Sequence, residues 1–164
     1  MTGLANRRVF DGQMAQRVAE FERYGNIFSL LLLDADHFKE LNDTHGHQAG
    51  DTVLRRLADV LRQTVRESDI VARYGGEEFA VILPETSIDG ARWSSERIRK
   101  AVEAESVPVG KTDLAVTLSI GAAEVLSGED VSELIERADA ALYASKRAGR
   151  NCSHWHDGGE IHRL

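Results

Sequence analysis

The sequence predicts an α+β fold in which helices pack against a mostly antiparallel sheet. Three observations support this prediction. Segments of helical and strand-like apolar spacing alternate along the chain, a Gly-Gly pair separates two strand-like segments, and the 164 residues suit one domain. The composition, 42% hydrophobic and 29% charged, is typical of a globular protein and excludes a disordered, fibrous or disulfide-rich chain.

The first part of the chain predicts a helix, a buried strand and two further helices. Apolar residues at helical spacing predict an amphipathic helix over 6–24, which Gly25 ends. Residues 28–33 include four consecutive leucines and predict a strand buried on both faces. A short helix over 38–44 and a longer helix over 48–65, which carries one apolar stripe, are expected next.

The second part begins with two short strands, 70–74 and 78–83, on either side of Gly75 and Gly76. This pair predicts a hairpin with a type I′ turn, which needs positive φ at both central residues. Asp130 and Glu133 are spaced as the capping box of a helix. The remaining predicted elements are, in order, a helix over 88–104, a strand over 114–123, a helix over 131–148 that ends at Gly149, and a short edge strand over 151–155.

Without its first helix and its last helix and strand, this order is β-α-β-β-α-β, the ferredoxin-like arrangement. In that topology the end of the first strand lies beside the tip of the hairpin. Asp34, Asp36, Glu77 and Glu78 would then gather at one edge of the sheet, where a hard cation such as Mg²⁺ would offset their repulsion. Alternatively, Asp36 caps the next helix and the two glutamates only solubilise a turn. Asp34 is harder to explain in that way, because it follows four buried leucines.

Several segments resemble the GGDEF family of diguanylate cyclases. Residues 73–79 read Arg-Tyr-Gly-Gly-Glu-Glu-Phe, the Glu-for-Asp form of the family motif. The resemblance covers residues 1–152 and implies a palm-like sheet, as in nucleotidyl cyclases, that condenses two GTP molecules to cyclic di-GMP and pyrophosphate. Residues 153–164 form a polar tail that we expect to fray. Further matching segments occur in the family's order at 2–8, 34–39, 42–47, 50–51 and 141–151.

The resemblance also implies a metal site. Asp34, Glu77 and the backbone carbonyl of Ala35 would hold Mg²⁺, or Mn²⁺ in its place, and Glu78 would help to hold a second ion. Glu77 would be catalytic, because it is the group best placed to receive the proton of the attacking 3′-hydroxyl. Two such metals would activate the nucleophile and stabilise the leaving group.

Asn42 and Asp51 would read the guanine edge by the same resemblance. A carboxylate suits the N1 and N2 donors of guanine, and a wrong base would leave it unpaired. As alternatives, Asn42 is a left-handed residue at a helix C-terminus and Asp51 is a charge favoured by a helix N-terminus. His47 is a candidate loop contact to the nucleotide. Structural roles are nevertheless favoured for His45 and His47, since no Cys or His partner lies at metal-ligand spacing.

The phosphates of the nucleotide would meet residues from two segments. The amides near His37 and Phe38, with the side chain of Lys39, would bind phosphate, and Lys146 and Arg150 would hold the terminal phosphates. Lys146 would act in catalysis by stabilising charge on the leaving pyrophosphate. Alternatively, Lys146 and Arg150 only complement the dipole at a helix end.

Arg66 and Asp69 match the family's Arg-x-x-Asp site, which binds product cyclic di-GMP and limits its synthesis. Five residues separate Asp69 from Gly75, as that site requires, and Arg97 would be a further product contact. An arginine can bind phosphate or guanine in a bidentate manner, and Asp69 would accept from guanine. The alternative is a helix-end ion pair of little energetic value.

The expected partners follow from the reaction and the composition. One domain holds one GTP, so we expect catalysis to need a homodimer. The family usually carries an N-terminal sensory or dimerisation module, and we expect such a module to be missing from this sequence. The formal charge of −7 argues against a nucleic-acid partner. The longest apolar run, 27–33, is too short to span a bilayer, so we expect membrane contact only through the missing N-terminal region. The lone Cys152 suits a reducing cytoplasm, where we expect the domain to lie.

Two other functions compete with an active cyclase. A non-catalytic module that binds cyclic di-GMP or GTP would share the fold, but such modules usually lose the motif acids, which are present here. A mononucleotide cyclase or polymerase-like palm would share the metal carboxylates. It would not explain the Gly-Gly-Glu-Glu-Phe hairpin together with Arg66 and Asp69.

Overall fold

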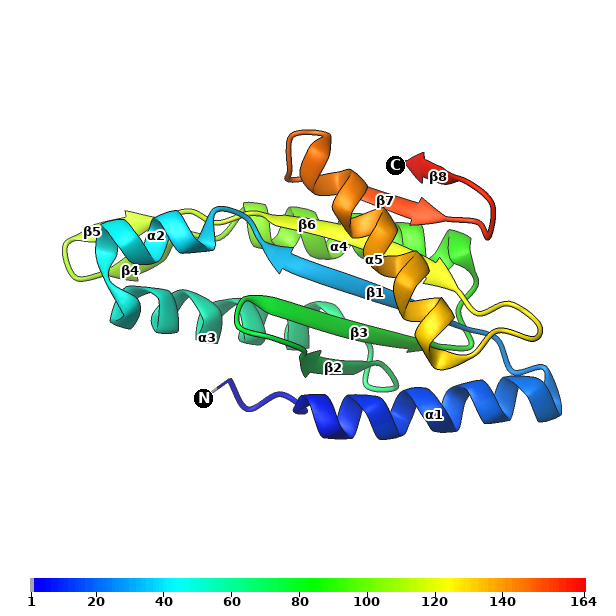
Figure 1. Ribbon diagram of the computed structural model, residues 1–164. Coiled ribbons are helices and arrows are strands. Elements are labelled where there is room, and N and C mark those ends of the chain that lie inside the picture. Colours follow the sequence, from blue (N-terminus) through cyan, green and yellow to red (C-terminus); the bar gives the residue numbers. More distant parts are fainter. Residues whose placement is uncertain (1) are drawn as a thin grey trace.

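The computed structural model describes residues 2–164 and is built around one six-stranded sheet with helices on both faces (Figure 1). The order across the sheet is β2-β3-β1-β6-β7-β8. The sheet strands are β1 (Phe28–Ala35), β2 (Ile70–Arg73), β3 (Glu78–Pro84), β6 (Leu118–Glu124), β7 (Ser153–His156) and β8 (Ile161–Arg163). The helices are α1 (Arg7–Tyr24), α2 (Phe38–His45), α3 (His47–Thr64), α4 (Ile88–Glu103) and α5 (Val131–Arg147).

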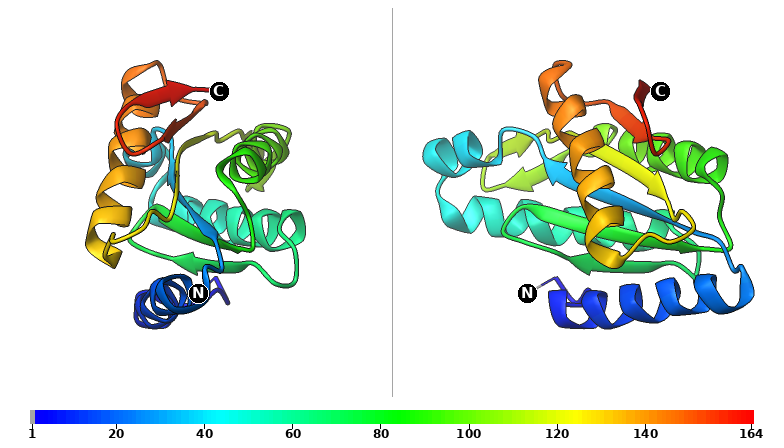
Figure 2. Two further views of the ribbon diagram at one scale, coloured as in Figure 1. Left: turned by 90° about the vertical axis from the view of Figure 1, so that its right-hand side faces the viewer. Right: turned by 45° about the vertical axis from the view of Figure 1, so that its right-hand side comes forward.

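Strand β1 is the centre of the molecule, and all eight of its residues are buried. Its side chains alternate between two apolar clusters. Leu31 and Leu33 belong to the cluster beneath α3 and α4, whereas Leu30 and Leu32 belong to the cluster beneath α1 and α5. Figure 2 shows α3 and α4 on one side of the sheet and α5 on the other. The predicted strand buried on both faces is thus confirmed.

The order β6-β1-β3-β2 confirms the predicted ferredoxin-like core. Strand β1 is antiparallel to both neighbours, and Asp34 pairs with Glu78 of β3 and with Ser119 of β6. The end of β1 therefore lies beside the hairpin tip, as expected. At the other end of the chain, Asp130 and Glu133 form the predicted capping box of α5.

Three local predictions were wrong. Gly75 and Gly76 are not among the residues with positive φ, so the hairpin does not use a type I′ turn. The expected strand over 114–123 is interrupted, and a separate two-stranded sheet of β4 (Val107–Val109) and β5 (Thr112–Leu114) precedes β6. The short strand predicted over 151–155 is present as β7, but the tail beyond it does not fray, because β8 pairs with β7 and takes the edge of the sheet.

The tail is held by side chains as well as by the strand ladder. The rings of Trp155 and His162 stack with centroids 4.4 Å apart, and His162 Nε2 lies 2.7 Å from Asp157 Oδ2. Asp157 Oδ1 accepts bonds from the amides of Gly159 and Glu160 and thereby fixes the turn between β7 and β8.

Within residues 2–164, no helix is long and apolar enough to cross a membrane.

Candidate active site

A hollow of about 250 Å³ opens where β1 ends, between α2, the hairpin loop and the end of α5. We call it the strand-end hollow. It brings together eight residues that the sequence placed in the site, from three separate segments of the chain. Its lining residues are Asp34, Ala35, His37, Phe38, Lys39, Glu40, Glu77, Lys146 and Arg150.

Asp34 and Lys146 form the ionic centre of this hollow. The Lys146 Nζ atom lies 2.8 Å from Asp34 Oδ2, and the side chains are 33% and 12% exposed. Asp34 shares a sheet face with Leu30 and Leu32, the face that α5 covers, so it meets the end of that helix. Lys146 therefore does more than complement a helix dipole, because its ammonium is a direct partner of a buried carboxylate.

The N-terminus of α2 forms another wall of the hollow. His37 precedes the helix with a left-handed backbone, φ 56° and ψ 25°, and its side chain does not cap the helix. A left-handed residue followed by helical residues turns successive amides toward one point, which forms an anion-binding concavity. The amides of Phe38 and Lys39 are also at a helix N-terminus, where the dipole favours negative charge.

The hairpin loop supplies Glu77. The Gly75 N–H donates to Glu78 O at 3.2 Å, and the Ala35 N–H donates to Glu77 O at 3.2 Å, which fixes the loop to the end of β1. Arg73, which sequence reasoning missed, donates through Nη2 to the Gly76 carbonyl at 2.7 Å and stiffens the loop. The sequence could have indicated this role, because Arg73 stands two residues before a Gly-Gly pair whose carbonyls are open to a nearby donor.

Glu78 lies elsewhere. A Cβ on Gly75 would be 2.4 Å from Glu78 Oε2, so a side chain there would have to displace this carboxylate, whereas the φ of Gly75 does not call for glycine. Within residues 2–164, Glu78 is not one of the residues that line the strand-end hollow. Asp36 does not cap α2 either. Both of its oxygens accept bonds, from Thr117, Ser119 and Asn151.

Asn42 and Asp51 lie on facing helices, outside the lining of the strand-end hollow. Asn42 Oδ1 is buried and has no hydrogen-bond partner within residues 2–164, and a Cβ on Gly50 would lie only 1.9 Å from it. Asn42 is inside α2 without positive φ, and Asp51 is the fifth residue of α3, so both helix-end alternatives were wrong. His47 is exposed at the start of α3.

Comparison with known families decides what this arrangement is. A family model described as "Diguanylate cyclase, GGDEF domain" matches residues 1–152. The chain belongs to the GGDEF family. The resemblance seen in its motifs is thereby confirmed, and the match ends just before β7.

Relatives of this GGDEF domain include two curated proteins. Diguanylate cyclase DgcP of Pseudomonas aeruginosa is 44% identical over 92% of the chain, and diguanylate cyclase DosC of Escherichia coli is 43% identical over 92%. The chain spans 22% of the length of the first and 33% of the length of the second.

Solved GGDEF domains share the fold. The GGDEF domain of DgcB from Caulobacter crescentus, in complex with c-di-GMP, has a TM-score of 0.88 and 45% identity, over 92% of this chain and 90% of that chain. The active GGEEF domain of a diguanylate cyclase from Vibrio cholerae has a TM-score of 0.87 and 31% identity, over 95% and 99%. These likenesses confirm the predicted α+β, cyclase-like fold.

GGDEF diguanylate cyclases generally depend on a divalent metal ion, and the donor set of this domain fits one. Asp34 and Glu77 line the same hollow and offer carboxylate oxygens. Mg²⁺ is typically bound by one or two protein carboxylates and completes its shell with phosphate and water. Within residues 2–164, no group of three or more His, Cys, Asp or Glu side chains is arranged to hold a metal. A two-carboxylate site that a bound phosphate completes is consistent with this.

The Arg-x-x-Asp segment forms a tight turn. The Arg66 N–H donates to Asp69 Oδ2 at 2.8 Å, and the Asp69 N–H donates to Arg66 O at 3.0 Å, so the carboxylate holds backbone rather than the guanidinium. Arg97 lies on α4, its guanidinium 4.6 Å from the ring centroid of Trp93. Arg66 and Asp69 line a second hollow of about 390 Å³, the N-terminal hollow, without Arg97; its other described lining residues are Gly3, Leu4, Ala5, Arg62, Val65, Glu67 and Val71.

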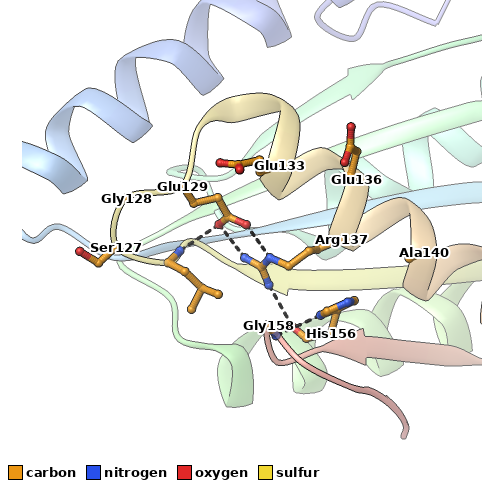
Figure 3. Close-up of a pocket in the computed structure, with 10 residues that line it drawn as sticks. Ser127, Gly128, Glu129, Glu133, Glu136, Arg137, Ala140, His156 and Gly158 are labelled. Carbon is orange, nitrogen blue, oxygen red and sulfur yellow. Dashed lines mark hydrogen bonds and ion pairs between the residues drawn. The ribbon is translucent and has the colours of Figure 1, made fainter.

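A larger hollow, of about 510 Å³, lies beside the start of α5 (Figure 3). Its central groups already satisfy one another. Arg137 donates to Glu129 Oε2 at 2.6 Å and to the His156 carbonyl at 3.1 Å, and Glu129 also accepts from the Leu126 amide. Volume alone therefore does not identify a binding site, and Arg137 here ties α5 to the loop before it and to β7.

Proposed function

We propose that this domain condenses two molecules of GTP into cyclic di-GMP and releases two molecules of pyrophosphate. One observation carries the proposal. Two carboxylates, Asp34 and Glu77, share the strand-end hollow with two cationic side chains, Lys146 and Arg150, and with a helix N-terminus. Phosphoryl transfer requires metal-binding acids and phosphate-binding cations at one place.

The reaction has two such steps, and each joins the 3′-oxygen of one guanine nucleotide to the α-phosphorus of the other. The bond between that phosphorus and the bridging oxygen breaks, and pyrophosphate leaves. Glu77 accepts the proton of the 3′-hydroxyl, and Lys146 and Arg150 neutralise charge as it builds on the leaving group. The amides of Phe38 and Lys39, with the Lys39 side chain, hold phosphate oxygens.

Asp34 and Glu77, with the Ala35 carbonyl, would hold Mg²⁺, or Mn²⁺ in its place. A bound divalent ion supplies positive charge that lowers the pKa of the attacking hydroxyl and offsets the charge of the phosphates. Glu78 is the candidate to help with a second ion. Its place beside Gly75 means that its side chain would have to turn toward the hollow.

Guanine recognition is assigned to Asn42 and Asp51, with His47 nearby on the same helix as Asp51. The orphaned Oδ1 of Asn42 supports this role, since a buried acceptor without a partner is costly unless a ligand satisfies it. The guanine N1 and N2 donors would pair with these oxygens. Because one domain has one such site, the two reacting nucleotides come from the two protomers of a homodimer.

Incubation of the purified protein with GTP and Mg²⁺, followed by chromatography, tests the proposal. Cyclic di-GMP should form, and Glu77→Gln should abolish turnover while keeping the melting temperature within a few degrees. Glu40→Gln is the matched control, because Glu40 lines the same hollow but is exposed and paired with His37. Binding of GTP or cyclic di-GMP without turnover, even at high protein concentration, would instead identify a binding module.

Product inhibition is the finer part of the proposal. Arg66, Asp69 and Arg97 would bind cyclic di-GMP, with Arg66 forking to phosphate or guanine. Arg66→Ala should weaken inhibition about tenfold or more while initial rates stay within about twofold. Glu67→Gln, in the same hollow, is the control. Unchanged inhibition in Arg66→Ala would rule out this site.

A further inference from the structure

The segment that carries Arg150 into the strand-end hollow has an unusual backbone. Gly149, Arg150 and Asn151 have φ values of 107°, 66° and 44°, so three consecutive residues are left-handed. Side chains with a Cβ disfavour this region, and only surrounding structure can maintain a run of it. Residues in sparsely populated backbone regions cluster at active sites and ligand clamps.

Two anchors hold this left-handed run. The Arg150 N–H donates to the Ser145 carbonyl at 3.1 Å, and the next amide, of Asn151, donates to Asp36 Oδ2 at 2.9 Å. The first anchor belongs to α5 itself. The second lies 115 residues away in the chain, at the end of β1. It links the strand that carries the candidate metal-binding acid to the turn that carries Arg150.

Asp36 is built to serve as this anchor. It is 5% exposed, and it also accepts from Thr117 Oγ1 at 2.7 Å and from Ser119 Oγ at 2.6 Å. Three donors satisfy both of its oxygens and stabilise its charge in a buried place. Asp34, two residues earlier, instead lines the hollow and meets Lys146. The two acids of this segment thus have different surroundings.

We propose that Asp36 is a positioning residue that holds Arg150 in the strand-end hollow for the terminal phosphates of the substrate. The inference rests on the proposed function and adds to it a role for the second acid. Asp36 acts through the Asn151 amide and does not touch the nucleotide. Without that bond, the left-handed run relaxes and Arg150 leaves the hollow.

Nucleotide binding by calorimetry tests this. The probes are 3′-deoxy-GTP, which cannot react because it lacks the attacking hydroxyl, and GMP, which lacks the terminal phosphates. Asp36→Asn should weaken 3′-deoxy-GTP binding about tenfold and GMP binding less than about twofold, the pattern also expected of Arg150→Ala. The double variant should bind no more weakly than Arg150→Ala alone. Glu103→Gln is the control. Glu103 accepts a bond from the side chain of Asn151 at 2.7 Å and not from its backbone N–H, so binding of 3′-deoxy-GTP by this variant should stay within about twofold.

Equal weakening for both nucleotides, additive losses in the double variant, or no loss in Asp36→Asn would each overturn the inference while leaving the proposed function intact. Failure of the unmodified protein to bind 3′-deoxy-GTP would overturn both. If Asp36→Asn does not fold, Asn151→Ala replaces it, because alanine tolerates left-handed backbone less well than asparagine. That variant must lose 3′-deoxy-GTP affinity selectively, or the inference is wrong.

Discussion

The Asp34–Lys146 pair should respond asymmetrically to the loss of either partner. Lys146→Met keeps most of the apolar stem but leaves the Asp34 carboxylate, 12% exposed, without its cation. Asp34→Asn leaves the Lys146 ammonium, which is 33% exposed and on a flexible stem that can turn into water. The loss of the partner therefore costs more for the less exposed carboxylate than for the ammonium, which can turn into water.

The magnitudes follow from this difference in exposure. Breaking a fully buried pair destabilises a protein by about 3–5 kcal/mol, and an exposed pair contributes about 0–1 kcal/mol. The intermediate burial here places Lys146→Met near a loss of about 2 kcal/mol and Asp34→Asn below about 1 kcal/mol. For a chain of this length, about 1 kcal/mol shifts the melting temperature by roughly 2–4 °C.

Thermal unfolding without nucleotide or added metal, followed by circular dichroism, measures both effects. Lys146→Met should lower the melting temperature by about 4–8 °C, and Asp34→Asn by less than about 4 °C. The double variant should resemble Asp34→Asn, because it contains neither charge and so leaves no buried carboxylate without a cation. Lys39→Met, which removes an exposed cation from the same hollow, should shift it by less than about 2 °C. A greater loss in Asp34→Asn than in Lys146→Met would refute the reasoning.

Three further outcomes follow from the backbone and from burial. Gly121→Ala should lose about 3 kcal/mol in denaturant unfolding, because a Cβ there would lie 2.2 Å from the backbone of α5 at Ala138 and Leu142. Gly75→Ala should lose less than about 1 kcal/mol in the same assay, because its Cβ would meet only the movable end of Glu78. Burial lowers the pKa of His154 in the folded protein. As the pH falls below the ordinary pKa of histidine, the unfolded chain is therefore protonated at this residue before the folded protein is, which favours unfolding. The melting temperature should therefore fall from about pH 7.5 to about pH 5.5, and fall less in His154→Gln.

Much of the fold was predictable because apolar spacing reports burial directly. The four leucines of β1 and the stripe of α3 could be read in this way. Strands β4 and β5 could not, because each has only three residues and the two are joined through Gly110. Nor could β8, because its three residues carry no apolar pattern; it pairs with β7, where Trp155 stacks on His162.

The candidate site likewise has features that could be predicted from the sequence and features that could not. The adjacency of Asp34 to the hairpin followed from topology, since it needed only the order of strands. The Gly-Gly turn was misread because a glycine pattern does not distinguish a need for positive φ from a need for space. The family resemblance placed Lys146 in the site only as a phosphate-binding group. Its pairing with Asp34 was not expected, because no local pattern shows how a helix docks.

The docking of α5 connects these observations. At Gly121 the helix approaches β6 so closely that no side chain fits between them. Ser145 then donates to the Ile120 carbonyl at 2.7 Å, which fixes the last turn of α5 on the sheet. Lys146 is the next residue, and its ammonium is thereby delivered to the end of β1. The cationic half of the site thus depends on a glycine and a serine that touch no nucleotide. A search for charged residues alone would pass over both.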